Sequence, residues 1–122
     1  MNKTLTKKER TVIDSIIKKY SSILLLNHFT IKLKEGTEHP ESLAECVFTY
    51  PYLNGILKVN VEKIRQRDQE SWNHIICHEL CHLVTDPLYD KAISRYVTKD
   101  EISAERERLT DHIANLIIKN NL

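Results

Sequence analysis

Apolar residues recur at helical spacing in the first part of the chain. Thr6 and Glu9 match a capping box, in which each side chain accepts a hydrogen bond from the other residue's backbone N–H. The apolar positions that follow lie three and four residues apart, which is the period of one helix face; they are Val12, Ile13, Ile16, Ile17 and Tyr20. The pattern predicts an amphipathic helix that ends near Leu24–Asn27.

A two-residue period follows this helix. The alternating apolar residues are Phe29, Ile31 and Leu33. This alternation is typical of a half-buried strand, and a second strand is predicted at Ala44–Tyr50, where Pro51 ends it. Asn54 and Gly55 indicate a turn before a third strand at Ile56–Val61. Because the three strands follow one another directly, we expect a three-stranded antiparallel sheet.

Helical spacing returns in the second half of the chain. A helix is predicted from about Asp68, and its buried side comprises Trp72, Ile75, Ile76, Leu80 and Leu83. Pro87 is expected to end it, because proline lacks the N–H that a helix interior needs. Thr98 and Glu101 match a second capping box, which predicts a last helix at Lys99–Lys119. The expected fold class is α+β.

Length, charge and cysteines narrow the class of protein. The 122 residues suit one domain spanning residues 1–122, and 18 basic against 17 acidic residues support neither a nucleic-acid nor a membrane partner. No apolar run approaches the roughly 18 residues of a membrane span. Three cysteines, an odd number, favour reduced thiols and a cytoplasmic location. Of these, Cys77 and Cys81 are expected to be small buried apolar residues.

The second long helix carries the pattern His-Glu-x-x-His at residues 78–82. Residues four apart lie on the same helix face, so His78 and His82 can bind one Zn²⁺ ion. Glu79 lies beside this pair, where a carboxylate can take a proton from water without being a ligand. The residues around the motif carry no charge, which predicts a buried helix whose polar groups need a partner.

Catalytic zinc usually has three protein ligands, so a third must come from another segment. Stepping 100° per residue from Ile102 places Glu107 at about 140°, within the apolar arc of the last helix. Glu105 and His112 fall at about 300° and 280°, on its charged side. Glu107 is therefore the expected third ligand, with Glu105 and then His112 as alternatives. Asp111, one turn beyond Glu107, is expected to accept the free N–H of a zinc-bound histidine.

The two motifs together resemble those of the gluzincin clan of zinc metallopeptidases. Members pair a His-Glu-x-x-His helix with a Glu-x-x-x-Asp helix, here residues 78–82 and 107–111. The likeness is greatest to minimal single-domain gluzincins and to small zinc-peptidase-like proteins of phages and bacteria, including phage-repressor-directed peptidases. It implies a zincin-like fold in which an extended substrate pairs with an edge strand, for which Ile56–Val61 is the candidate. A Sprt-type protease would instead need His112 as ligand.

The resulting hypothesis is zinc-dependent hydrolysis of a peptide or protein substrate. His78, His82 and Glu107 would hold Zn²⁺, and Glu79 would activate a zinc-bound water. The candidate donors to the developing oxyanion are Tyr89, Arg95, Tyr96 and His112. The alternative is a zinc-binding module that recognises a partner protein without turnover, or a peptidase inhibited by its own C-terminal residues 120–122.

Overall fold

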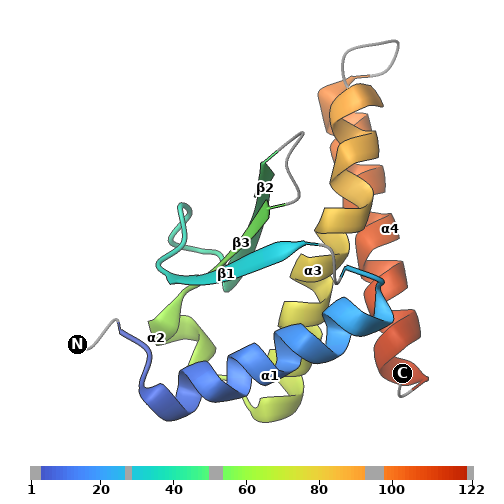
Figure 1. The fold of residues 1–122 in the computed structure, drawn as a ribbon. Helices are drawn as coiled ribbons and strands as arrows, with labels where there is room; N and C mark the ends of the chain where they lie inside the picture. The colour runs from blue at the N-terminus through green and yellow to red at the C-terminus, as the bar shows by residue number, and fades with distance from the viewer. Residues whose placement is uncertain (1–3, 27–28, 50–53, 93–97, 121–122) are drawn as a thin grey trace.

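The computed structural model describes residues 4–26, 29–49, 54–92 and 98–120. Within these ranges the chain forms helices and strands in an α+β arrangement (Figure 1). In chain order they are α1 (Lys7–Ile23), β1 (Thr30–Glu35), β2 (Ala44–Thr49), β3 (Asn54–Val59), α2 (Val61–Ile64), α3 (Gln69–Ala92) and α4 (Lys99–Lys119). Among the described residues, no helix combines the length and apolarity needed to cross a membrane.

The predicted capping box begins α1. The backbone N–H of Glu9 donates to Thr6 Oγ1 at 3.1 Å, and the N–H of Thr6 donates to Glu9 Oε1 at 2.8 Å. The buried side of the helix is the predicted one; it includes Ile13, Ile16, Ile17 and Tyr20. The guanidinium of Arg65, just after α2, donates to both oxygens of Glu9 at 2.8 Å and so ties the start of α1 to the end of α2.

The sheet is mixed, so the predicted antiparallel sheet is wrong. Its strand order is β1-β3-β2, with β1 parallel and β2 antiparallel to β3. Residues 36–43 carry the chain past the position of β3, and the N–H of Gly36 donates to Val59 O at 2.8 Å as this connection leaves β1. An alternating pattern shows which side of a strand is buried but not which strand lies beside it, and sequential strands are neighbours only about two-thirds of the time.

The third strand is the central one. Leu57 and Val59 of β3 are fully buried, and Asn54 and Gly55, predicted as a turn, belong to this strand. The strand ends at Val59, two residues before the predicted end. Asn60 then caps the short helix α2, which the sequence analysis did not predict, by accepting from the N–H of Lys63.

The helix α3 continues past Pro87 to Ala92, although proline was expected to end it. A proline inside a helix costs about 3 kcal/mol. The helix contacts α4 on both sides of Pro87. Before it, Thr85 Oγ1 lies 3.0 Å from the fully buried Thr110 Oγ1; after it, the buried Tyr89 packs against Arg106.

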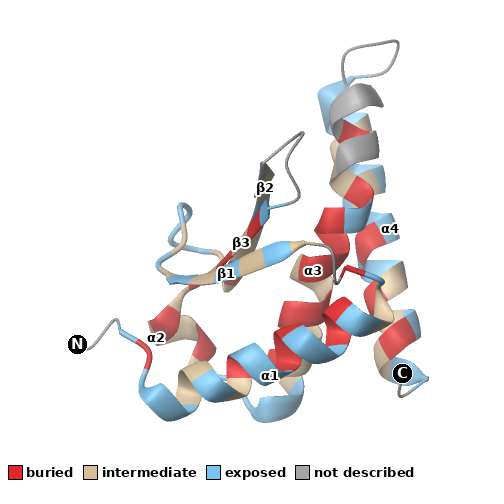
Figure 2. Ribbon diagram, in the orientation of Figure 1, coloured by how far each residue is buried: buried red, intermediate tan, exposed pale blue. Residues whose placement is uncertain are grey.

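The helix α4 begins and ends where predicted, with Thr98 as its N-cap. It lies along α3, which also packs against α1 and β2 (Figure 1). Figure 2 shows buried residues where α1, α3 and the sheet face one another. The middle of α3 is thus held on three sides, by the sheet, α1 and α4, which positions the His-Glu-x-x-His residues.

Candidate metal centre

The middle of α3 brings the three charged or polar residues of the motif together. His78, Glu79 and His82 each offer one candidate ligand atom, and these atoms lie within 4.8 Å of one another. The helix buries its other side, because Ile76, Cys77, Leu80 and Cys81 are fully buried. The two cysteines are therefore buried as expected, and both are free thiols. The helix thus buries one side in the core and brings the two imidazoles close together on the other.

The carboxylate of Glu107, on α4, faces the two histidines. Its Oε1 lies 3.5 Å from His78 Nε2, and its Oε2 lies 3.4 Å from His82 Nε2. Ligand atoms about 2.0–2.1 Å from a tetrahedral zinc ion are about 3.3 Å apart. Each histidine nitrogen thus lies about as far from one Glu107 oxygen as two zinc ligands lie from each other, and imidazole and carboxylate are donor types that zinc binds.

The outer nitrogen of each imidazole faces an aspartate. His82 Nδ1 lies 3.0 Å from Asp86 Oδ1, and His78 Nδ1 lies 3.5 Å from Asp111 Oδ1. Such contacts orient metal-binding histidines and set which ring nitrogen carries the proton. Asp111 thus lies where the sequence analysis expected it. The role of Asp86 was missed, although its position four residues after His82 was a signal, because the helix was expected to end there.

The exposure of Glu107 differs from expectation, since 48% of its side chain is accessible rather than buried. It lies at the rim of the α3–α4 contact, and its carboxylate reaches inward. Glu105, the first alternative ligand, is exposed and accepts a hydrogen bond from Arg108 Nε at 2.9 Å. His112, the second alternative, is also exposed. The structure brings Glu107 to the histidines, and no contact with them is described for either alternative.

The surroundings shift the protonation of all three motif residues. Burial, together with His82, lowers the pKa of His78, which favours the neutral imidazole that metals require. Burial opposes the charged form of His82 as well, but the hydrogen bond and charge of Asp86 outweigh it and raise the pKa of His82. Burial raises the pKa of Glu79 to about 7, with a further contribution from the negative charge of Glu107. A carboxylate with that pKa can both accept and return a proton near neutral pH.

The edge strand beside the motif is β2 rather than the predicted third strand. The segment predicted to pair with substrate, Ile56–Val61, lies mostly in β3 at the centre of the sheet, with both neighbours occupied. On β2, the backbone of Cys46 hydrogen-bonds the Glu79 carboxylate and lowers its pKa. Among the described strands none pairs with this edge of β2. The backbone groups on this edge, close to Glu79, are therefore not paired with another described strand.

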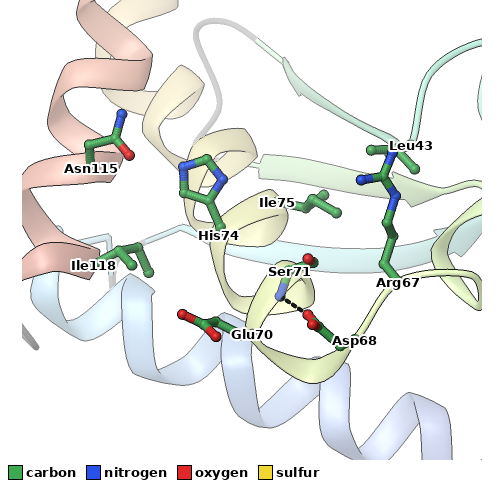
Figure 3. A pocket seen from close by; sticks show the side chains of 9 residues that line it. All are labelled: Leu43, Arg67, Asp68, Glu70, Ser71, His74, Ile75, Asn115 and Ile118. Atoms are coloured by element: carbon green, nitrogen blue, oxygen red, sulfur yellow. Dashed lines mark hydrogen bonds between the residues drawn. The ribbon is translucent and has the colours of Figure 1, made fainter.

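A groove leads from the motif toward the start of α3. A hollow of about 260 Å³ is lined by Ser42, Leu43, Ala44, His74, Ile75, His78 and Glu79. A second hollow of about 470 Å³ shares Leu43, His74 and Ile75 with it (Figure 3). The second hollow extends to Asn115 and Ile118 of α4 and to Arg67 and Glu70. The shared lining makes one groove between the beginning of β2 and the end of α4.

Two of the four candidate oxyanion donors, Tyr89 and His112, are among the described residues. Tyr89 is buried, and its ring is covered by the guanidinium of Arg106. His112 is exposed. Arg95 and Tyr96 lie outside the described residues. Arg106, which the sequence analysis did not consider, contacts both Glu107 and Asp86.

The C-terminal residues proposed as an inhibitory tail are only partly described. Asn120 follows Glu107 by 13 residues along α4, which corresponds to about 20 Å of helix. Asn120 therefore lies away from the histidines, and Asn121 and Leu122 are outside the described residues.

A scan against protein-family models and a search of curated proteins find no match to this chain.

Proposed function

We propose that this protein is a zinc-dependent peptidase in which His78, His82 and Glu107 hold the metal and Glu79 is the general base. The observation that carries the proposal is the convergence of two imidazole Nε2 atoms on one carboxylate at 3.5 and 3.4 Å. Three protein ligands leave one tetrahedral position for water or substrate, as in catalytic rather than structural zinc sites.

The bound zinc ion would polarise the scissile carbonyl and make a water molecule more acidic. Glu79 takes a proton from the attacking water and returns it to the leaving amine. Its pKa of about 7 suits both transfers. Asp86 and Asp111 hold the imidazoles of His82 and His78 in the orientation that presents Nε2.

An extended peptide is the substrate that fits the surroundings best. Its backbone can pair with the outward edge of β2, because main-chain hydrogen bonds recognise an extended chain whatever its side chains are. The Cys46 backbone interacts with Glu79, so a strand added to this edge would run close to the base. The groove lined by Leu43, His74 and Ile75 takes up side chains of such a peptide.

The proposal extends to the fold family and the location. A helix with the histidines, a helix with the glutamate and a small sheet beside them support a zincin-like assignment. Cys46, Cys77 and Cys81 are free, which supports a reducing, cytoplasmic environment.

Metal analysis and peptide cleavage by paired variants test the proposal. Glu79→Gln is expected to bind zinc as wild type does but to cleave a quenched peptide library 10²–10⁴-fold more slowly, because the base is lost. Glu107→Gln is expected to lose both zinc and cleavage. The control variant Glu105→Gln removes the same charge from the same helix. Because Glu105 pairs with Arg108 away from the site, this variant is expected to keep both zinc binding and cleavage.

The same measurements separate a peptidase from a binding module. Wild-type protein that binds zinc through four protein ligands and cleaves no peptide would favour the module. Retained hydrolysis in Glu79→Gln would exclude the role given to Glu79. Retained zinc in Glu107→Gln would exclude Glu107 as a ligand.

A further inference from the structure

Arg106 is the basic side chain that the described structure places against the carboxylates of the metal centre. Its Nε donates to Glu107 Oε2 at 3.2 Å and lies 3.9 Å from Asp86 Oδ1. These two carboxylates belong to different helices, and each contacts His82, at Nε2 and at Nδ1 respectively. Arg106 thus links the candidate third ligand to the residue that orients the second histidine.

The guanidinium is itself held in place. Its Cζ lies 4.0 Å from the centre of the buried Tyr89 ring, a distance typical of a cation–π contact. Its Nη2 donates to Ser103 Oγ at 3.4 Å, and only 23% of the side chain is exposed. An arginine stacked on a ring has few alternative conformations, so its Nε–H points in a fixed direction.

The backbone of the same residue joins the two helices. Arg106 O accepts from Thr110 Oγ1 at 2.7 Å, and that hydroxyl lies 3.0 Å from Thr85 Oγ1. Thr85 Oγ1 in turn lies 3.3 Å from Asp86 Oδ1. Side chain and backbone therefore both connect this position on α4 to Asp86 on α3.

We propose that Arg106 is a positioning residue of the metal centre, which holds the carboxylates of Glu107 and Asp86 at the places that zinc binding requires. The inference rests on the metal ligands of the proposed function. Arg106 donates to Glu107 and thereby fixes a half-exposed side chain that would otherwise adopt many rotamers. By its contact with Asp86, it also supports the orientation of His82.

A positioning role and a purely electrostatic role predict opposite effects. A positive charge repels a bound cation, so its removal would by itself tighten zinc binding. If Arg106 positions the ligand set, removal instead weakens binding, as changes around metal ligands typically do by 10–100-fold. The direction of the change therefore distinguishes the two roles.

The test measures Zn²⁺ affinity by competition with a chromophoric chelator, together with the visible spectrum of the Co²⁺-substituted protein. Arg106→Gln is expected to bind zinc about 10-fold more weakly and to change the Co²⁺ spectrum. Arg106→Lys keeps the charge but loses the planar donor and the ring contact, so about threefold weaker binding is expected. The control variant Arg108→Gln removes the same charge from the same helix. Because Arg108 pairs with the exposed Glu105, the zinc affinity of this variant is expected to stay within about twofold of wild type.

Wild-type affinity or tighter binding in Arg106→Gln would overturn the inference, as would equal weakening in Arg108→Gln. If Arg106→Gln does not fold, Arg106→Lys decides, and a wild-type affinity and spectrum there would also overturn it. A wild-type protein that binds no zinc would refute the proposed function itself. Zinc binding that is insensitive to Arg106 would refute only the positioning role.

Discussion

Glu79 is a carboxylate whose buried environment disfavours its charged form. Burial, with Glu107 and Asp86 nearby, raises its pKa from 4.5 to about 7, and His82 and the Cys46 backbone only partly compensate. Such groups cluster at catalytic sites, because the properties that suit proton transfer are unfavourable for folding. The metal-free protein is therefore expected to be less stable with Glu79 than with a neutral residue of the same shape.

The metal-free Glu79→Gln variant is expected to exceed wild type in stability by roughly 1–3 kcal/mol at pH 8. The folded state holds the Glu79 proton up to about pH 7, whereas the unfolded chain releases it near 4.5. Wild type consequently loses stability as the pH rises through this window, and below pH 4.5 the two proteins should converge. Denaturant unfolding with a chelator, at pH 4.5 and pH 8, measures the difference. Equal stability at pH 8 would contradict the stated cost of burying Glu79.

At the scale of elements, α1 is held at its start by a charge pair as well as by a cap. Glu9 accepts from the Thr6 N–H and from two nitrogens of Arg65. The hydrogen bonds with Arg65 contribute most to lowering the pKa of Glu9 to about 2. The contact joins α1 to α2, which are separated in the chain by the whole sheet, so the cap is also a tertiary contact.

Glu9→Gln is expected to lower the free energy of unfolding by about 1 kcal/mol at pH 7. Because the folded pKa of Glu9 is depressed, its contribution is present above pH 4.5 and is lost as the pH falls toward 2. The deficit of the variant should therefore shrink over that range, as measured by urea unfolding at several pH values. Asp14→Asn, at an exposed position of the same helix, serves as the charge control. A deficit independent of pH would argue against the ion pair as its cause.

For the whole molecule, the proposed metal centre joins α3 to α4. The two histidines come from one helix and Glu107 from the other. Carboxylates of Glu79, Asp86, Glu107 and Asp111 gather around the histidines. A cation there relieves their mutual repulsion, so metal binding and folding should be coupled.

Zinc is expected to stabilise the wild-type protein against unfolding by about 2.7 kcal/mol when free zinc is 100 times its Kd. Thermal unfolding with zinc and with a chelator measures this gain. Glu107→Gln should abolish it, because only the α3 ligands remain, whereas Glu105→Gln should retain it. A gain that survives in Glu107→Gln would place the metal on α3 alone.

The sequence by itself determined the features that depend on near neighbours in the chain. Both capped helices begin where Thr6 and Thr98 predict, because capping involves residues three apart. The strands lie close to the segments of alternating apolar residues, because this alternation is also a pattern between near neighbours. His78 and His82 share one face because of helix geometry alone, and this spacing was enough to propose a metal.

The tertiary structure decided whatever depends on contacts between distant segments. Strand order is one such feature, because alternation does not encode the neighbour of a strand, and the candidate substrate edge moved to β2 as a result. The passage of α3 beyond Pro87 is another, since its stabilising contacts come from α4. That passage places Tyr89, which follows the proline, against the guanidinium of Arg106 on α4. Packing of α4 against α3, which no local pattern specifies, thus brings Glu107 and Arg106 to the histidines of the motif.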